Sequence, residues 1–440
     1  MRVPSFMSQA SGRLRFRAVD RAADAVRRVH ELGEATAGTI FTRFNAAKIV
    51  ARAETVDRDS TLKEGLLAGA LVTIKDLFDE EGEVTTAGSR QLEGASPATS
   101  DAEAVRRLLA AGAVPFGRTS MTEFAYSGIG LNPHFGTPGN SHDPERIPGG
   151  STSGGAIAVA YGLADAALGS DTGGSLRIPA AFNALAGFKP TQSSVSLEGG
   201  FPLSKSYDSF GAIAPEIATC AAIHAVLSGD ALPQEGSTEE RPLRFAVMRT
   251  LVTDDMDEAV TRDFDGALER LEEAGHDITD VTLDALSATG AVNRIIVAAE
   301  AHGVHRDHLN ALETSGDPRV LKRIRAAETF SEIEISDAYE TRKRAVAAFK
   351  ELASGYDAIL MPTVPIVAPL IEEVEDDFDR LNALVLRNPS TVNFVDGCAA
   401  TVPMHSGDGL PTGLMIVGPA GCDWRVLQIA DMVEALLAEA

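Results

Sequence analysis

Short apolar runs alternate with amphipathic segments along most of this chain of 440 residues. Residues 69–78 (GALVTIKDLF) and 243–248 (LRFAVM) are mostly apolar and predict buried strands, the first ending near Lys75. Residues 21–32 and 257–277 carry apolar side chains at helical spacing. Such alternation favours an α/β fold, in which helices cover a sheet.

The same pattern predicts further elements. Residues 48–59 indicate a second helix, and residues 102–113 indicate a helix with Asp101 as its N-cap. Two more strands are expected at 114–120 and at 356–369, where prolines end the apolar run. The helix within 257–277 should end at Gly275, and the acidic run Glu372–Asp379 should form a solvated face.

The composition of the chain argues against some binding partners and cellular locations. The chain has 63 acidic and 39 basic residues, a net charge of −24, which opposes binding to nucleic acid or to an anionic membrane. No apolar run approaches the ~18 residues of a membrane span. The three cysteines, Cys220, Cys398 and Cys422, form no CxxC pair and favour a reducing, cytoplasmic location.

Two segments have little apolar periodicity. The first 18 residues are rich in arginine and are interpreted as a frayed start before a helix near Asp20. Residues 228–242 combine proline, glycine and charged residues, which makes them the best candidate for a linker.

Several familiar chemistries are disfavoured by the motifs. No G-x-S-x-G elbow surrounds the serines of residues 149–175, and the G-rich run 149–155 lacks the G-K-[ST] ending of a phosphate loop. Ser60 and Lys63 have S-x-x-K spacing but stand without the companion motifs. Residues His302, His305 and His308 lie three apart, so on a helix they would not converge on a metal.

Three residues remain whose side chains together could provide a base, an intervening hydroxyl and a nucleophile. Residues 128–200 are dense in Gly, Ser, Thr and Pro but include apolar patches, which predicts a folded core with functional loops. Lys75 ends an apolar strand, Ser151 lies in a glycine-rich turn, and Ser175 follows two glycines. A lysine in a dry pocket loses its proton readily and can act as a base through an intervening hydroxyl. Glycines before a nucleophile allow backbone N–H groups to face an oxyanion.

Six sequence blocks carry a resemblance to a known family. The blocks are VTIKDLFDEEGEVTTAGS (72–89), TSMTEFAYSG (119–128), the long block from Pro148 to Thr191, YDSFGAIA (207–214), YDAILMPTVP (356–365) and DGLPTGLMIVGP (408–419). Together they resemble the amidase signature family from about residue 20 to the end of the chain. The central block is long and highly specific.

The resemblance implies both fold and mechanism. It implies a single α/β domain over residues 1–440, a large mixed twisted sheet covered by helices on both faces, with a catalytic core at 60–215. Residues 228–242 then become an internal surface loop. The family's Ser-cisSer-Lys triad falls on Lys75, Ser151 as the cis serine, and Ser175 as the nucleophile. Its oxyanion donors fall on the backbone of Thr172, Gly173, Gly174 and Ser175. No metal or organic cofactor is implied.

Two positions depart from the family's pattern. The stretch after the cis serine is commonly Ser-Gly-Gly-Ser, and here it is residues 152–155, Thr-Ser-Gly-Gly. The usual Asn after Lys-Asp is Leu77. Both departures concern neighbouring contacts and leave the triad intact.

Other residues have both structural and functional interpretations. Asp171 is expected to orient the Ser175 loop, and Arg177 either binds a substrate carboxylate or forms a buried ion pair, for example with Asp171. The remaining substrate-binding candidates are Met121, Tyr126, Gly149 and Gly150, with Phe124, His302, Arg387, Asn388 and Asn393 as weaker pocket candidates.

The leading functional prediction is an amidohydrolase that cleaves a small carboxamide or urea-like substrate without a cofactor. Its expected partner is the small-molecule amide alone, with no direct contact to nucleic acid or membrane, and a homodimer is compatible with this. Two alternatives stay open. One is the glutaminase component of a tRNA-dependent amidotransferase, its catalytic A subunit, and the other is a non-catalytic binding protein on the same scaffold.

Overall fold

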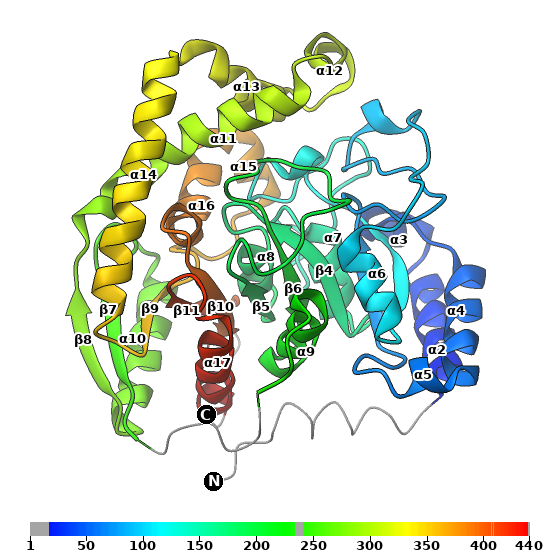
Figure 1. Cartoon of the computed structure of the whole chain (residues 1–440), viewed down its shortest axis with the longest axis horizontal. Helices are drawn as coiled ribbons and strands as arrows, with labels where there is room; N and C mark the ends of the chain where they lie inside the picture. Colours follow the sequence, from blue (N-terminus) through cyan, green and yellow to red (C-terminus); the bar gives the residue numbers. More distant parts are fainter. Residues whose placement is uncertain (1–16, 234–240, 406, 408, 439–440) are drawn as a thin grey trace.

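One mixed sheet organises the chain. The computed structural model describes residues 17–233, 241–405, 407 and 409–438, and these contain a single sheet of eleven strands (Figure 1). The strands lie side by side in the order β1 (Phe41–Arg43), β3 (Val114–Thr119), β2 (Leu71–Lys75), β4 (Ala166–Asp171), β6 (Ser209–Ala214), β5 (Ala186–Lys189), β10 (Cys398–Pro403), β11 (Gly413–Gly418), β9 (Ala358–Pro362), β7 (Arg244–Met248) and β8 (Asp277–Val281). Strand β2 runs parallel to β3 and β4, whereas the central strands β4, β6, β5, β10, β11 and β9 pair antiparallel.

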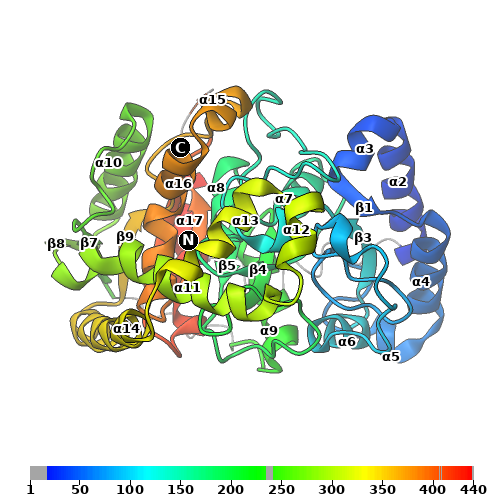
Figure 2. The same cartoon turned by 90° about the horizontal axis from the view of Figure 1, so that it is seen from above.

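Helices cover the sheet on both faces. The helices in chain order are α2 (Ala18–Glu31), α3 (Glu34–Ile40), α4 (Ala46–Arg58), α5 (Ser60–Lys63), α6 (Glu103–Ala110), α7 (Ser153–Ala160), α8 (Arg177–Phe182), α9 (Ile217–Ser228), α10 (Glu258–Glu273), α11 (Thr289–His305), α12 (Leu309–Ser315), α13 (Pro318–Arg325), α14 (Glu332–Ala353), α15 (Ile371–Asp376), α16 (Phe378–Phe394) and α17 (Asp423–Ala438). On one face α6 contacts α9, α9 contacts α17 and α17 contacts α10, and on the other α8 contacts both α7 and α16. Figure 2 shows α10 and α14 on opposite sides of β7 and β8. This confirms the expected α/β architecture.

Helix α7 packs in a tight space. Its sequence SGGAIAVA is apolar or small on every side, and all but its last residue are buried. A Cβ at Gly154 would lie 2.3 Å from the Ile40 carbonyl oxygen and 2.8 Å from the Ser120 nitrogen. Only glycine therefore allows this helix to approach α3 and the end of β3 so closely.

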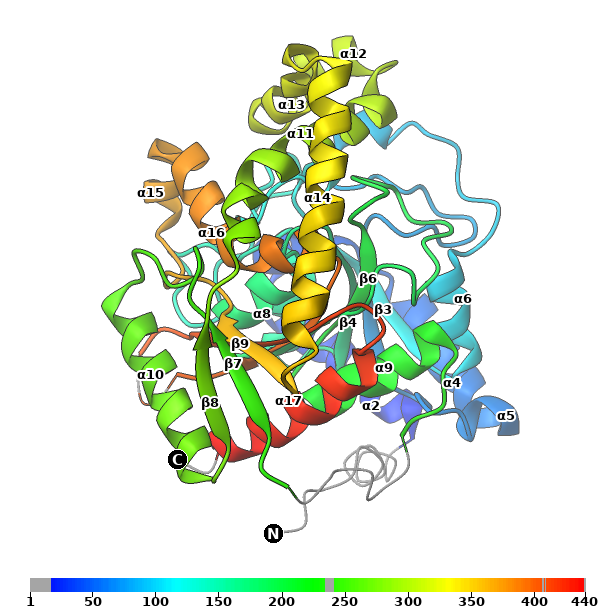
Figure 3. The ribbon, with the colours of Figure 1, turned by 60° about the vertical axis from the view of Figure 1, so that its left-hand side comes forward.

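Helices α11 to α14 extend beyond the sheet. Figures 1 and 3 show α12 and α13 at the far end of α14, away from the strands. Glu300 in α11 ties this arm to the loop before β6, because its carboxylate accepts hydrogen bonds from the Ser204 hydroxyl at 2.5 Å and the Ser206 N–H at 3.0 Å. Within the arm, the Tyr339 hydroxyl of α14 donates to the same carboxylate at 2.6 Å. Among the residues that the structure describes, no helix combines the length and apolar character needed to cross a membrane.

Most predicted elements are confirmed, with one corrected boundary. The helices at 21–32 and 48–59 are α2 and α4, and the strand at 69–78 is β2, which ends at Lys75. The N-cap of α6 is Ala102, whereas the sequence pattern predicts Asp101 there. The Asp101 carboxylate instead accepts the Glu81 N–H at 2.8 Å, a contact with a distant loop that draws it away from the helix. The proposed frayed start and the middle of the 228–242 segment lie outside the described residues.

Candidate active site

Lys75 lies at the end of β2, next to the end of its parallel neighbour β4. Its Nζ donates hydrogen bonds to Ser151 Oγ at 2.8 Å and to Ser170 Oγ at 2.9 Å, and all three side chains are buried. Burial lowers the pKa of Lys75 to about 7, although the negative charges of Asp171 and Asp208 act in the opposite direction. A large fraction of Lys75 is therefore neutral near pH 7 and able to accept a proton.

Ser151 is held on a turn that only glycines can form. The Gly150–Ser151 peptide bond is cis, and the Gly150 N–H donates to the Gly128 carbonyl at 2.8 Å. A Cβ at Gly150 would lie 2.6 Å from the Gly130 nitrogen. The Ser151 carbonyl accepts the Thr122 N–H at 3.3 Å, so both sides of the turn are fixed to the 119–130 segment. The Ser151 hydroxyl is fully buried beside Lys75.

Ser175 follows β4 and precedes α8. The Thr152 N–H donates to the Ser175 carbonyl at 3.3 Å, which joins the two serine-bearing segments. Gly174, with φ of 132°, leaves room for Pro389 and Ile178, since a Cβ there would lie 2.6 Å from Ile178 Cδ1. Ser175 lines a cavity of about 460 Å³, whereas Lys75 and Ser151 are not among the residues that line it. The structure thus places the expected nucleophile at the cavity wall.

Asp171 orients the Ser175 loop. Its Oδ1 accepts the Gly174 N–H at 2.8 Å and its Oδ2 accepts the Leu176 N–H at 3.2 Å. Arg177 pairs with the same carboxylate at 2.8 Å, and both side chains are fully buried. Burial alone would raise the pKa of Asp171, but Arg177 lowers it to about 2. Asp171 is therefore ionised, and Arg177 forms the buried ion pair that was one of its two interpretations.

The hydrogen bonds of Asp171 limit which backbone N–H groups can bind an oxyanion. Of the four expected N–H groups, that of Gly174 is directed at Asp171. The N–H groups of Thr172, Gly173 and Ser175 remain the candidates for an oxyanion. The Thr172 hydroxyl donates to Asp208 Oδ1 at 2.5 Å, and burial raises the pKa of Asp208 to about 6. Sequence reasoning missed Asp208, although it lies in the YDSFGAIA block.

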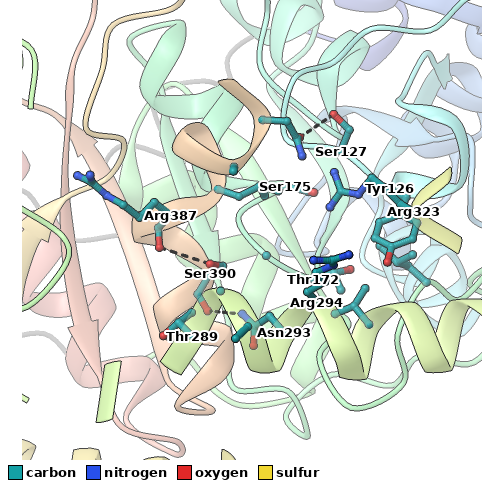
Figure 4. A pocket seen from close by; sticks show the side chains of 18 of the residues that line it. Tyr126, Ser127, Thr172, Ser175, Thr289, Asn293, Arg294, Arg323, Arg387 and Ser390 are labelled. Atoms are coloured by element: carbon teal, nitrogen blue, oxygen red, sulfur yellow. Dashed lines mark hydrogen bonds between the residues drawn. The ribbon is translucent and has the colours of Figure 1, made fainter. Parts of the chain in front are cut away.

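Some of the weaker substrate-binding candidates line the cavity and others do not. Tyr126 and Arg387, two of these candidates, are among the residues that line it (Figure 4). The lining does not include Met121, Phe124, Gly149, Gly150, Asp171, Arg177, His302, Asn388 or Asn393. Asn388 donates to the Val252 and Pro362 carbonyls at 2.8 and 2.9 Å, and Asn393 donates to Asp171 Oδ1 at 3.0 Å, so both amides support the surrounding structure.

Several lining residues were not predicted at all. Helices α11, α13 and α16 supply Thr289, Asn293, Arg294, Arg323, Asn382 and Ser390. None of them belongs to a motif, and they meet only because three helices converge over the ends of β4 and β6. Their convergence is a product of tertiary packing that no local spacing shows.

The residues of the other motifs lie outside the cavity lining. His305 is buried against Phe124, with ring centroids 4.2 Å apart, and no group of three metal-ligand side chains occurs in the described part of the chain. Ser60 and Lys63 are exposed on α5. All three cysteines are free thiols.

Comparisons with known proteins agree with this geometry. The family model described as Amidase matches residues 23–427. The chain belongs to the amidase family. This amidase is 31% identical over 455 residues to the A subunit of the glutamyl-tRNA(Gln) amidotransferase of Symbiobacterium thermophilum, covering 94% of this chain and 92% of that protein. It is 30% identical over 415 residues to the 2-amino-5-chloromuconic acid deaminase of Comamonas testosteroni, covering 91% of this chain and 88% of that protein.

Solved structures share the fold of this amidase. A crystal structure of an amidase has a TM-score of 0.87 at 29% identity, covering 98% of this chain and 99% of that one. An inhibitor-bound complex of an s-triazine catabolic enzyme has a TM-score of 0.85 at 27% identity, covering 100% and 98%. The family and fold predictions are confirmed, and the chain is an enzyme of the class that hydrolyses C–N bonds of amides.

Proposed function

We propose that this amidase cleaves a small carboxamide through an acyl-enzyme on Ser175, without a partner protein. The observation that carries the proposal is the buried hydrogen bond of 2.8 Å from Lys75 Nζ to Ser151 Oγ, in a segment whose Thr152 N–H donates to the carbonyl of Ser175, a serine on the cavity wall. A weakly basic, desolvated lysine and a relay hydroxyl are what an alcohol nucleophile needs in a cavity whose described lining contains no histidine.

Acylation begins with attack of Ser175 Oγ on the substrate carbonyl carbon. The Ser175 proton passes to Ser151 Oγ, and the Ser151 proton passes to Lys75 Nζ, which becomes an ammonium. The oxyanion accepts hydrogen bonds from the N–H groups of Thr172, Gly173 and Ser175. When the C–N bond breaks, the leaving nitrogen takes a proton from Ser151, and Lys75 returns one to Ser151.

Deacylation uses the same relay. A water attacks the acyl ester and loses a proton to Ser151 and, through it, to Lys75. The ester C–O bond then breaks, and Ser175 Oγ recovers a proton by the reverse path. The products are a carboxylic acid and ammonia or an amine, and the enzyme returns to its starting protonation state.

The glutaminase component of a tRNA-dependent amidotransferase is the second candidate. Its support is sequence similarity, since several proteins named as the A subunit of such an enzyme are 30 to 32% identical to this chain over most of its length. The deaminase named above is 30% identical, so identity alone does not favour either assignment. A non-catalytic binding role is the weakest candidate, because the chain has Lys75, Ser151 and Ser175 at the positions that the family's motifs give to the triad.

Ammonia release distinguishes these candidates. We expect the chain alone to release ammonia from at least one member of a panel of simple amides, ureas and glutamine, and Ser175→Ala to release none. If the chain alone releases no ammonia from any compound of the panel, self-sufficient hydrolysis is contradicted. Release from glutamine only after a partner protein is added would support the amidotransferase assignment instead.

A further inference from the structure

The cavity beside Ser175 has a positive charge that contrasts with the whole molecule. The chain carries a net charge of −24, yet the described residues that line the cavity include three arginines, Arg294, Arg323 and Arg387, and one acid, Asp379. Asp379 is exposed and its carboxylate pairs with Lys322 Nζ at 2.5 Å. The guanidinium groups therefore dominate the charge that a bound molecule meets.

Arg323 is the arginine best prepared to bind a ligand. Its guanidinium carbon lies 4.5 Å from the centre of the Tyr126 ring, so the plane of the group is supported by an aromatic surface. Its Nη1 is enclosed and has no hydrogen-bond partner among the described residues. Burial lowers the pKa of Arg323, while Tyr126 and Asp379 act in the opposite direction. An enclosed donor without an acceptor is costly unless a ligand supplies one.

The helix that carries Arg323 is fixed to the segment that carries Tyr126. The Asp317 side chain caps α13 by accepting the Arg319 N–H at 2.9 Å. The Asp317 N–H in turn donates to Glu123 Oε2 at 2.6 Å, and Glu123 is three residues from Tyr126. Arg323 and Tyr126 are thus held as one unit before any ligand arrives.

The other two arginines differ in the protein groups that they already contact. Arg387 donates from Nε to Asn388 Oδ1 at 3.0 Å and from Nη2 to the Val252 carbonyl at 3.4 Å. Arg294 is exposed, and its guanidinium carbon lies 5.8 Å from the centre of the Phe330 ring. In Figure 4 Arg294 and Arg323 lie on the same side of the cavity as Tyr126. A ligand group placed there meets two guanidinium groups.

We propose that the substrate is a small amide that also carries a carboxylate, and that Arg323 binds this carboxylate with support from Arg294. The inference rests on the proposed hydrolytic function of Ser175. A planar guanidinium matches the two oxygens of a carboxylate in a fork, and such charge-assisted pairs are among the strongest hydrogen bonds. Monoamides of short dicarboxylic acids, such as succinamate and glutaramate, represent this substrate class in a cavity of about 460 Å³.

Matched substrates test the proposal in the unaltered enzyme. Succinamate and succinamide have the same shape but differ by one negative charge, and so do glutaramate and glutaramide. We expect kcat/KM for the better monoamide acid to exceed that of its neutral diamide by at least about tenfold, as a charge-assisted pair requires. Equal values for acid and diamide would overturn the inference and leave the proposed hydrolysis standing.

Variants of Arg323 test whether this residue causes the preference for the acid over the diamide. Arg323→Gln should lower kcat/KM for the acid by about 30- to 100-fold and change that for the diamide by less than about threefold. Arg323→Lys should retain part of the preference, because it keeps the charge and loses the fork. Arg58→Gln, an equal charge change on the exposed side of α4, is the control and should alter neither value. An equal loss for both substrates in Arg323→Gln would contradict a role in carboxylate binding.

Binding in a hydrolysis-dead background separates the two proposals. Titration calorimetry of Ser175→Ala with succinate and glutarate should show binding, and adding Arg323→Gln should weaken it by about 30-fold or more. If the unaltered chain hydrolyses none of these amides while binding in Ser175→Ala still depends on Arg323, the hydrolytic function alone is refuted. Absence of carboxylate binding in Ser175→Ala would overturn the inference. If Arg323→Gln fails to fold, Arg323→Lys and the matched substrates still decide the question.

Discussion

At the scale of single residues, the chemistry depends on how Lys75 is buried. Its Nζ has two hydroxyl acceptors at hydrogen-bond distance, Ser151 and Ser170, and the nearby Asp171 is neutralised by Arg177. Desolvation is therefore opposed by Asp171, which Arg177 neutralises, and by Asp208, whose carboxylate accepts the Thr172 hydroxyl. This explains how a lysine whose ordinary pKa is far above neutrality can act as a base in this site.

The pH dependence of activity follows from Lys75. Because its pKa is lowered to about 7, Lys75 is protonated and inactive as a base below that pH and neutral above it. We expect kcat/KM to rise through a midpoint near pH 7 and to fall about tenfold per pH unit well below it. A pH profile with any hydrolysed amide measures this.

The control for that profile is a variant of Asp208. Burial raises the pKa of this carboxyl to about 6, so its titration has to be told apart from that of Lys75. The variant Asp208→Asn should keep the rise with pH but move its midpoint below pH 7, because it removes a negative charge that raises the pKa of Lys75. Loss of the pH dependence in Asp208→Asn, or full activity of Lys75→Ala, would refute Lys75 as the base.

At the scale of elements, glycines set how closely the helices pack around the site. Helix α7, which follows Ser151, touches α3 and the residue after β3 through Gly154. Helix α3 contains a second glycine, Gly38, which has open space where a Cβ would be. The two positions form a matched pair, since both lie inside a helix and only one is crowded.

This pair predicts opposite changes in stability. Gly154→Ala should lower the free energy of unfolding by about 1–3 kcal/mol or more, because the new Cβ would meet backbone atoms that have little freedom to move. Gly38→Ala should raise it by about 0.4–1 kcal/mol, because alanine restricts the unfolded chain. Urea denaturation of both variants measures the difference. Similar values for both would show that α7 is less tightly packed than the structure indicates.

At the scale of the whole molecule, the sequence predicts the sheet better than the cavity. Strand β2 and its end at Lys75 follow from a local apolar run, and the proposed triad follows from motifs within the first half of the chain. Arg323 and Arg294 could not be found in this way, because they meet the Ser175 loop only after α11 and α13 fold back over the sheet. The wrong N-cap at Asp101 has the same cause, since its partner Glu81 comes from a separate loop.

The proposed mechanism directs one serine, Ser175, at a small amide. Labelling with a reactive fluorophosphonate, followed by peptide mapping by mass spectrometry, identifies the nucleophile. We expect one adduct per chain on Ser175, none in Ser175→Ala, and strongly slowed labelling in Lys75→Ala. An adduct on another serine, or undiminished labelling of Ser175→Ala, would refute Ser175 as the nucleophile.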